Sequence, residues 1–563
     1  MGEFNHRKYQ PAPQIAMPNR QWPNNTITQT PQWCSVDLRD GNQALVEPMN
    51  VQQKLRMWDL LVKLGFTQIE VGFPAASQPD FDFVRALIDG DRIPGNVTIQ
   101  VLTQAREELI ARSYQALKGA KNAIVHVYNS TSPVQRERVF GLDKQGIVDI
   151  AVQGAKWVKE YAAHQPETNW SFQYSPESFS STEVEFAVEI SDAVIAEWRD
   201  SGNQIIINLP ATVECASPNV FADQVEWFCN HTQYREDITV CVHTHNDRGC
   251  GVAAGELAVM AGADRVEGTL LGNGERTGNM DIVTMAMNLY SQGVDPGLNL
   301  ADMDEIIAVV EHCTAIPLHP RHPYAGELVF TAFSGSHQDA IRKCLSKQQD
   351  DEHWQVAYLP IDPADLGRSY EAVIRINSQS GKGGVSWVLE NDYGLQLPRW
   401  LQIDASRMVQ ARAEEISGEV TSAQIWELFD AHYLQAHKDI RIENFSVSQD
   451  NTENAGQDVL SLSFKNQSGS TVLKGHGDGA ISALVDAWQN EYGDKIEILD
   501  YREHALGSGT DSQAIAYVHL SINNQRYIGI AKHRDVISAS LQAVLNASVQ
   551  AASNSAEAER LAS

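Results

Sequence analysis

The sequence of 563 residues predicts an α/β protein whose largest part is a (β/α)8 TIM barrel, and two observations predict it. Between residue 31 and about residue 300, a short β-rich run that ends in polar or glycine residues is followed by a helical stretch, and this unit occurs eight times. Eight such units agree with the size and strand number of a closed barrel. A doubly wound open sheet usually has fewer strands and needs a glycine-rich fingerprint after its first strand, which is missing.

Each β-rich run is short and contains β-branched or aromatic residues. In chain order the runs are "WCSVDLRDGNQ", "TQIEVGFPAAS", "VTIQVLTQ", "NAIVHVYNSTS", "NWSFQYSPES", "NQIIINLPATVE", "ITVCVHTHND" and "DRVEGTLLGNG". Several of the stretches between them are long enough for helices, for example "VQQKLRMWDLLVKLG" and "STEVEFAVEISDAVIAEWRD". We therefore expect parallel strands that alternate with helices.

Other segments flank this barrel, which we place at residues 31–305. Residues 1–30 are polar and rich in proline, which predicts an extended N-terminal arm. Residues 306–425 contain helical stretches and a loop-rich segment, and we expect helical linker subdomains there. Residues 426–563 contain alternating strands and two helices, which predict a C-terminal α+β domain.

The composition limits the possible functions. A hydrophobic content of 43% and a charged content of 20% are typical of a soluble globular protein. The formal charge of −29 argues against nucleic-acid binding, because such a surface repels phosphates. The sequence has no signal peptide and no apolar run long enough to span a membrane. Its seven cysteines are odd in number and never spaced as CxxC, so we expect reduced thiols in the cytoplasm and no cysteine zinc site.

Candidate site residues lie at the carboxyl ends of the predicted strands, where the βα loops of a barrel form the active site. In chain order they are Arg39 and Asp40 at strand one, His126 on strand four, Ser175 and Glu177 at strand five, Thr212 at strand six, His243 and His245 at strand seven, and Asn279 in the loop "GNGERTGN" after strand eight.

The pair His243 and His245 predicts a metal site. In an extended strand, residues two apart point to the same side, so both imidazoles can bind one divalent ion. Asp40 is the best carboxylate for a third ligand, and Asn279 can add an amide oxygen. Such a pair alone is more often not a ligand pair, but the Arg39–Asp40 dipeptide and the loop of Asn279 favour a catalytic metal. Two nitrogen and two oxygen ligands suit Mg²⁺, Mn²⁺ or Zn²⁺.

The other candidates have structural alternatives. Arg39 is a surface salt bridge in one interpretation, and in the other its guanidinium binds an oxo acid or a developing oxyanion. Glu177 and Ser175 can cap a helix, and His126 can be a core histidine. The loop "GNGERTGN" is not a nucleotide-phosphate loop, because it lacks the Lys-Ser/Thr pair.

Five motifs occur in sequence order: "DLRDGNQ", "VGFPAAS", "QYSPESF", "HTHNDRGCGVAAGELAVMAGADRVEGTLLGNGERTGN" and "AFSGSHQDAI". Together they closely resemble the long form of the 2-isopropylmalate synthase family, over residues 31 to about 550. The wider barrel superfamily also contains homocitrate synthase, citramalate synthase and hydroxymethylglutaryl-CoA lyase.

The resemblance implies a Claisen condensation of acetyl-CoA with 2-oxoisovalerate that gives 2-isopropylmalate and CoA, the first committed step of leucine biosynthesis, in a homodimer inhibited by leucine. It implies Asp40, His243, His245 and Asn279 as metal ligands. It places Arg39, His126, Ser175, Glu177 and Thr212 around the 2-oxo acid. It implies that His337, in "SGSHQDA", reaches the site from the partner subunit, and that Tyr370 is a second linker residue.

Further expectations follow from the same resemblance. His337, oriented by Glu177, is the candidate general base, with Arg39 as oxyanion stabiliser and Tyr370 among the catalytic residues. The C-terminal domain is similar to the family's leucine-sensing domain, although the sequence has Gly477-Asp478-Gly479-Ala480 where the family has Gly-Asn-Gly-Pro. The alternatives are a homocitrate or citramalate synthase, a metal-dependent hydrolase, whose HxH pair belongs on the first strand, and a non-enzymatic amino-acid sensor.

Overall fold

The computed structural model describes residues 5–12, 14–332, 335–349, 351–368, 382–416, 420–449, 457–466, 469–507 and 512–562. The chain divides into two compact units. The first contains Met1–Phe330 and Pro360–Ser369, and the second contains Thr331–Leu359 and Tyr370–Ser563. No helix among the described residues combines the length and the apolar character needed to cross a membrane.

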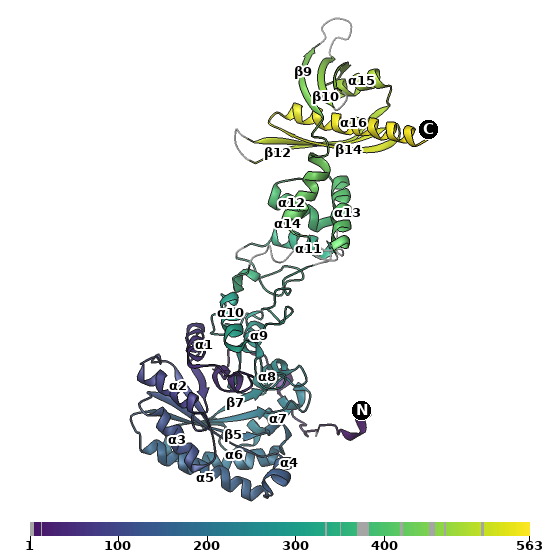
Figure 1. Ribbon diagram of the computed structural model, residues 1–563. Helices are drawn as coiled ribbons and strands as arrows, with labels where there is room; N and C mark the ends of the chain where they lie inside the picture. The colour runs from purple at the N-terminus through teal and green to yellow at the C-terminus, as the bar shows by residue number, and fades with distance from the viewer. Residues whose placement is uncertain are drawn as a thin grey trace. The chain divides into compact units, whose positions relative to one another are not determined.

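The first unit is built on a closed barrel of eight parallel strands, all within the described segment 14–332 (Figure 1). The barrel closes because β1 pairs with β8 as well as with β2. The prediction of a TIM barrel is thereby confirmed. The strands are β1 Gln32–Ser35, β2 Gln68–Gly72, β3 Thr98–Gln104, β4 Asn122–Ser130, β5 Asn169–Glu177, β6 Gln204–Ala211, β7 Ile238–Thr244 and β8 Arg265–Gly268.

Helices follow the strands and surround the barrel (Figure 1). They are α1 Val51–Leu64, α2 Gln78–Asp89, α3 Glu107–Leu117, α4 Pro133–Gln135, α5 Lys144–Ala163, α6 Val184–Trp198, α7 Pro218–His231, α8 Gly251–Met260, α9 Ile282–Tyr290 and α10 Met303–Thr314. Local sequence sets the ends of α1: Asn50 and Gln53 form a capping box, and Gly65 ends the helix at a φ of 100°.

The N-terminal arm is fastened to α7. The Arg20 guanidinium makes two hydrogen bonds of 2.6 Å with the Asp223 carboxylate. The indole Nε1 of Trp22 donates to Asp223 Oδ1 at 2.7 Å, and the Gln21 backbone N–H donates to Glu226 Oε1 at 2.7 Å. The arm is therefore held by charge-assisted hydrogen bonds and a buried indole.

The interior of the barrel contains a charged network where most such barrels have branched apolar side chains. Arg265 and Glu267 are completely buried and paired, with Nη1 and Oε1 2.8 Å apart. Gln173 Nε2 donates to Glu267 Oε1 at 2.8 Å, and Gln100 Nε2 donates at 3.0 Å both to Glu267 Oε1 and to Glu70 Oε1. Buried charges cost free energy unless they are paired, and here each has several partners.

The second unit contains helices α11 Gly335–Leu345, α12 Lys382–Tyr393, α13 Arg399–Ile416 and α14 Ser422–Phe429. An α+β part follows, as expected, with two antiparallel sheets in the orders β11-β10-β9 and β12-β13-β14. Its elements are β9 Arg441–Gln449, β10 Asp458–Asn466, β11 Gly469–Gly477, α15 Ala480–Tyr492, β12 Ile496–Leu506, β13 Gln513–Ile522, β14 Gln525–His533 and α16 Val536–Ala562.

This α+β part consists of the same unit twice, three antiparallel strands followed by a helix. In each copy the helix crosses its sheet closely at a glycine. A Cβ on Gly475 of β11 would lie 2.4 Å from the Ala483 carbonyl oxygen in α15, and a Cβ on Gly529 of β14 would lie 1.9 Å from the Ala543 carbonyl oxygen in α16. The sequence of β11, "GSTVLKGHG", is rich in glycine and polar residues, so its composition alone does not predict a strand.

Candidate active site

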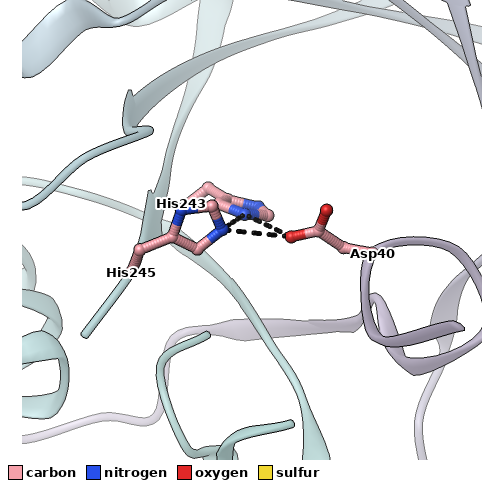
Figure 2. Close-up of side chains that lie close together, drawn as sticks. All are labelled: Asp40, His243 and His245. Atoms are coloured by element: carbon pink, nitrogen blue, oxygen red, sulfur yellow. Dashed lines mark hydrogen bonds and ion pairs between the residues drawn. The ribbon is translucent and has the colours of Figure 1, made fainter. Parts of the chain in front are cut away.

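Asp40, His243 and His245 meet at the carboxyl end of the barrel (Figure 2). The Nε2 atoms of the two histidines lie 3.4 Å apart, and Asp40 Oδ2 lies 3.3 Å from the first and 3.1 Å from the second. All three side chains are buried. Two imidazole nitrogens and a carboxylate oxygen that converge in this way form a ligand set for a divalent metal.

The three candidate ligands lie on different backbone structures, two at the end of a strand and one on a helical turn. His243 lies on β7, and His245 follows the strand in an isolated bridge. Asp40 does not lie on β1, which ends at Ser35, but on a π-helical turn at Asp37–Gly41. A π turn is often found at functional sites, and here it places Arg39 and Asp40 at the mouth of the barrel.

The residues present fit a metal ion, because Asn279, the fourth predicted ligand, has a buried side-chain oxygen without a hydrogen-bond partner among the described residues. Asn279 pairs with His245 in the isolated bridge, and its side chain is 2% exposed. Its Nδ2 donates to the Asn273 carbonyl oxygen, whereas its Oδ1 is buried without a hydrogen-bond partner among the described residues. A buried carbonyl oxygen without a donor costs free energy, and a cation would remove that cost.

The loop that carries Asn279 depends on its glycines. A Cβ on Gly274 would lie 2.1 Å from Asn279 Nδ2, and a Cβ on Gly278 would lie 2.0 Å from the Gly272 carbonyl oxygen. Gly278 also has a φ of 98°. The glycines of "GNGERTGN" therefore allow the chain to fold tightly around Asn279.

Contacts at the Nδ1 atoms, on the side away from the candidate metal position, orient the two histidines. Glu267 Oε2 lies 2.9 Å from Nδ1 of His243, and the Thr212 carbonyl oxygen lies 2.6 Å from Nδ1 of His245. His243 Nδ1 therefore carries the proton, which leaves its Nε2 lone pair for a metal, whereas His245 Nδ1 also lies 2.7 Å from Nη2 of Arg276, a donor. Burial alone would lower the pKa of His243, but its hydrogen bonds with Asp40 and Glu267 raise it to about 9.

Arg39 connects the candidate metal ligands to the barrel interior. Its Nη1 donates to Asp40 Oδ1 at 2.6 Å and its Nε donates to Glu70 Oε2 at 2.5 Å. Burial opposes ionisation of Asp40, but the Arg39 charge and the two histidines hold the pKa of that carboxyl well below its usual range. The salt bridge weighed from the sequence exists, and it lies inside the site rather than on the surface.

A cavity of about 550 Å³ opens beside the three candidate ligands, and the remaining predicted barrel residues His126, Ser175, Glu177 and Thr212 line it. His126 Nε2 lies 2.7 Å from Ser175 Oγ. Glu177 accepts a hydrogen bond from Ser130 Oγ, and Thr212 Oγ1 accepts the backbone N–H of Ser178 at 3.0 Å. The cavity is lined by Arg39, Asp40, His126, Ser175, Glu177, Thr212, His243 and His245, and also by Leu102, Tyr128, Asn208 and Pro210.

His337 and Tyr370, the two predicted linker residues, both belong to the second unit. His337 lies on α11 of the second unit, where it is exposed and its ring stacks on Tyr358 with centroids 4.0 Å apart. Tyr370 lies outside the described residues.

Sequence reasoning missed the residues behind the site, namely Glu70, Gln100, Gln173, Asn208, Arg265 and Glu267. Each is buried and hydrogen-bonded within its strand, and Arg265 is the first residue of β8. The available signal was a single polar residue inside an otherwise apolar strand, as in "TIQV" and "SFQY". Such a residue points into the barrel when its apolar neighbours point outward.

A closed parallel barrel with a buried His-His-Asp cluster at its carboxyl end defines a barrel enzyme with a candidate divalent-metal site. Residues 30–310 match the HMGL-like family, residues 327–390 the alpha-isopropylmalate synthase post-catalytic domain-like family, and residues 419–552 the LeuA allosteric (dimerisation) domain. The chain is 58% identical to a 2-isopropylmalate synthase of Alcanivorax borkumensis over 97% of both chains. It is 53% identical to a 2-isopropylmalate synthase of Pseudomonas putida over 96% of both chains.

The chain therefore belongs to the 2-isopropylmalate synthase family. The expected activity, an acyltransferase of leucine biosynthesis, is confirmed at the level of this family. Among solved structures, an HMG-CoA lyase of Acenitobacter baumannii aligns with a TM-score of 0.41 and 17% identity, over 52% of this chain and 94% of that one.

Proposed function

We propose that the chain condenses acetyl-CoA with 2-oxoisovalerate and then hydrolyses the thioester, which releases 2-isopropylmalate and CoA. The observation that carries this proposal is the buried cluster of Asp40, His243 and His245 beside Arg39, on a cavity large enough for a small acid and an acetyl group.

Asp40, His243 and His245 would hold the metal, and the orphan Oδ1 of Asn279 is the fourth candidate ligand. The ion, Mg²⁺, Mn²⁺ or Zn²⁺, supplies Lewis acidity when it is bound. Arg39 stabilises the alkoxide oxygen that forms on the former ketone carbon, because its guanidinium is fixed by two carboxylates before the reaction begins.

The lining of the cavity favours an apolar 2-oxo acid. Arg39 is the one guanidinium or ammonium group among the lining residues, all of which are described, and it is already paired with Asp40 and Glu70. A 2-oxo acid with a second carboxylate, such as 2-oxoglutarate, would need another cation. Leu102 and Pro210 instead give the wall an apolar part that suits an isopropyl group.

Release of CoA thiol, followed with a thiol reagent, tests this function. Wild-type protein with acetyl-CoA is supplied with 2-oxoisovalerate, 2-oxoglutarate or pyruvate, with and without EDTA. We expect the fastest release with 2-oxoisovalerate, and loss of release with EDTA that Mg²⁺, Mn²⁺ or Zn²⁺ restores. A faster rate with either other acid would assign a sister synthase, and hydrolysis of acetyl-CoA without any 2-oxo acid would contradict a synthase.

A general base must remove a methyl proton from acetyl-CoA. For this step we propose His337 of the partner subunit, oriented by Glu177, with Tyr370 as a further linker residue of the site. The resemblance in "SGSHQDA" and the match of residues 419–552 to a dimerisation domain support a site shared in a homodimer.

Subunit mixing tests this shared site. We expect His337→Ala and Asp40→Ala subunits to be inactive alone, because each would lack one essential group. In mixed dimers one of the two sites receives both intact groups, so activity should rise above either variant alone. If tagged heterodimers form and no activity returns, the sharing of His337 between subunits is wrong.

We also propose that leucine binds the α+β part of the second unit and inhibits the enzyme. A second cavity of about 550 Å³ there lies at the N-terminal ends of α15 and α16. Its wall combines the apolar side chains Val447, Ile481, Ile498, Val536 and Ile537 with the carboxylates Asp458 and Glu503. Helix N-termini attract a carboxylate and acidic groups attract an ammonium, so the wall suits a zwitterion with an apolar side chain.

A charge introduced into this cavity tests the effector site. Ile537→Asp places a carboxylate in the apolar wall, and we expect leucine to inhibit this variant at least tenfold more weakly than wild type. The matched control is Val472→Asp on β11, since Val472 is exposed but does not line the cavity. Unchanged inhibition of the Ile537 variant would place the effector elsewhere.

The division of the chain into an arm at 1–30, a barrel at 31–305, linker subdomains at 306–425 and a regulatory domain at 426–563 is part of this proposal, as is a cytoplasmic location. Both rest on the sequence patterns described above.

A further inference from the structure

Strand β12 contributes side chains to both faces of its sheet, and each face has a different neighbour. On one face, Ile498, Tyr501 and Glu503 line the cavity of about 550 Å³ at the N-terminal ends of α15 and α16, here called the effector cavity. On the other face, Asp500 and His504 contact residues 396–400, the segment that leads into α13. The same strand therefore touches both the proposed leucine site and a linker helix.

A bulge in β12 produces this division of its residues. The register of β12 against β13 shifts between Ile498 and Asp500, so Leu499 is an extra residue. As a result Ile498 and Tyr501 share a face although they are three residues apart, and Asp500 lies on the other face. Among the described strands, β12 pairs with β13 alone and lies at the edge of its sheet. A bulged edge strand has fewer backbone hydrogen bonds to hold it than a central strand, so a small movement of it costs less free energy.

The Asp500 carboxylate connects the two faces. Its Oδ2 accepts the indole Nε1 hydrogen of Trp400 at 2.9 Å, and its Oδ1 accepts the backbone N–H of Tyr501 at 2.9 Å. The Tyr501 hydroxyl is hydrogen-bonded to Glu503 and to Ser540 of α16, and all three residues line the effector cavity. A movement of the Tyr501 backbone consequently moves the acceptor of the Trp400 indole.

Trp400 is held on the sheet by further contacts. Its ring stacks on the imidazole of His519 with centroids 4.9 Å apart, and the neighbouring Gln396 backbone N–H donates to His504 Nε2 at 3.1 Å. Trp400 lies in the first turn of α13, which packs on α12, and α12 packs on α11, the helix of His337. The contact at Trp400 therefore leads to the linker helix that carries the proposed general base.

We propose that β12 and Trp400 transmit occupancy of the effector cavity to the linker helices. A ligand that fills the cavity fixes the side chains of β12 that line it, and the adjustment of the strand moves Asp500 and with it Trp400 and α13. This inference rests on the proposed function, because it requires that leucine binds this cavity and inhibits the synthase. It goes beyond that function by naming the contact through which the effector acts. Trp400 is a positioning residue in this scheme.

A second aromatic contact between the linker helices and the same sheet provides a comparison. The Lys532 ammonium of β14 lies 4.4 Å from the ring centroid of Trp426 on α14, and this ring stacks on Tyr393 of α12. Among the described residues, none of β14 lines the effector cavity. Trp426 thus joins the linker to the sheet without touching the strand that lines the cavity, and Trp426→Phe is the matched control for Trp400→Phe.

The test compares full-length wild type, Trp400→Phe and Trp426→Phe. Leucine binding is measured in a calorimeter, and inhibition is measured as the ratio of the rate of thiol release without leucine to the rate at saturating leucine. Phenylalanine keeps a ring against His519 but has no N–H for Asp500. We expect the ratio to fall by about fivefold or more in Trp400→Phe, the lower limit of typical coupling between two sites, while leucine still binds and the rate without leucine stays within about twofold of wild type. Trp426→Phe should keep the wild-type ratio.

Asp500→Asn tests the same contact from the strand. Asparagine has one side-chain oxygen where aspartate has two, so its NH₂ group faces the N–H of either Trp400 or Tyr501. The double variant Trp400→Phe/Asp500→Asn should lose no more inhibition than the stronger single variant, because the two groups form one contact. Hydrogen–deuterium exchange of the wild type needs no variant, so it decides the matter if the variants do not fold. Leucine should slow exchange in β12 and at the start of α13 together.

A wild-type ratio in a Trp400→Phe variant that binds leucine would overturn this inference, and so would an equal loss of inhibition in Trp426→Phe or additive losses in the double variant. Slower exchange in β12 without any change at the start of α13 would overturn it as well, while leaving the effector site in place. A wild-type protein that does not bind leucine, or binds it without inhibition, would overturn the proposed regulation and this inference together.

Discussion

The substitution Glu267→Gln is expected to weaken metal binding although Glu267 lies behind the candidate metal ligands. The carboxylate accepts hydrogen bonds on both oxygens. Oε2 faces His243 Nδ1 at 2.9 Å, and Oε1 faces donors of Arg265, Gln100 and Gln173 at 2.8–3.0 Å. A glutamine has the same shape but one amide NH₂ in place of an acceptor. In either orientation, the amide N–H therefore faces another hydrogen-bond donor, either His243 or Arg265.

The size of the loss in metal affinity depends on which donor faces the NH₂ group of the new glutamine. If the NH₂ faces His243, the imidazole must move its proton to Nε2, and the lone pair for the metal is lost. Loss of such an outer contact typically lowers metal affinity by about 10–100-fold, which corresponds to about 1.4–2.7 kcal/mol. The buried Arg265 also loses its counter-charge, so we expect the free energy of unfolding to fall by about 3 kcal/mol.

Metal-depleted wild type and variant are titrated with Mn²⁺ in a calorimeter, and unfolding is followed by denaturant titration. The matched control is Glu305→Gln, which changes a surface carboxylate paired with Lys63 and should leave metal affinity unchanged. An unchanged Mn²⁺ affinity in a folded Glu267→Gln variant would show that Glu267 does not set the tautomer of His243.

Three further predictions concern the arm, the sheets and the pH dependence. Gly529→Ala should lower the free energy of unfolding by about 1–3 kcal/mol, because its Cβ would lie 1.9 Å from a carbonyl oxygen of α16; Gly95→Ala, which meets nothing within 4 Å, is the control in the same melt. Trp22→Ala should speed tryptic cleavage in the arm and lower the free energy of unfolding by about 3 kcal/mol, because the buried indole and its hydrogen bond to Asp223 are lost. Equal cleavage rates in the variant and the wild type would contradict this. The raised pKa of His243, about 9, means that its protonated form stabilises the metal-free protein fully below its ordinary pKa of 6.5, and that this contribution is lost as pH rises through about 9. Metal binding should consequently release a proton below pH 9, seen as a buffer-dependent binding enthalpy, and a buffer-independent enthalpy at pH 7.5 would refute it.

The barrel could be predicted because its signals are local. Strand length, the alternation with helices and the polar residues at strand ends are all written in short windows of the chain. His243 lies on β7 and His245 directly follows the strand, and because residues two apart in an extended chain point to the same side, their convergence could be predicted from the sequence. The C-terminal sheets were harder, since β11 has glycines at 475 and 477 where the close approach of α15 excludes any Cβ. The packing of α15 requires glycine at these two positions. As a result, the composition of β11 is not typical of a strand.

The sequence by itself determined the fold class, the family and the identity of the side chains at the barrel mouth, because each depends on motifs and periodicity within single units. Only the tertiary structure decided what those side chains contact. It placed Asp40 on a π turn between the histidines and Arg39, gave Asn208 and Asn279 their orphan oxygens, and joined Glu70, His126 and Ser175 in one hydrogen-bonded chain. These contacts join residues up to 205 positions apart, such as Asp40 and His245, and hydrogen-bond geometry at such separations is fixed by the closure of the barrel rather than by any local pattern.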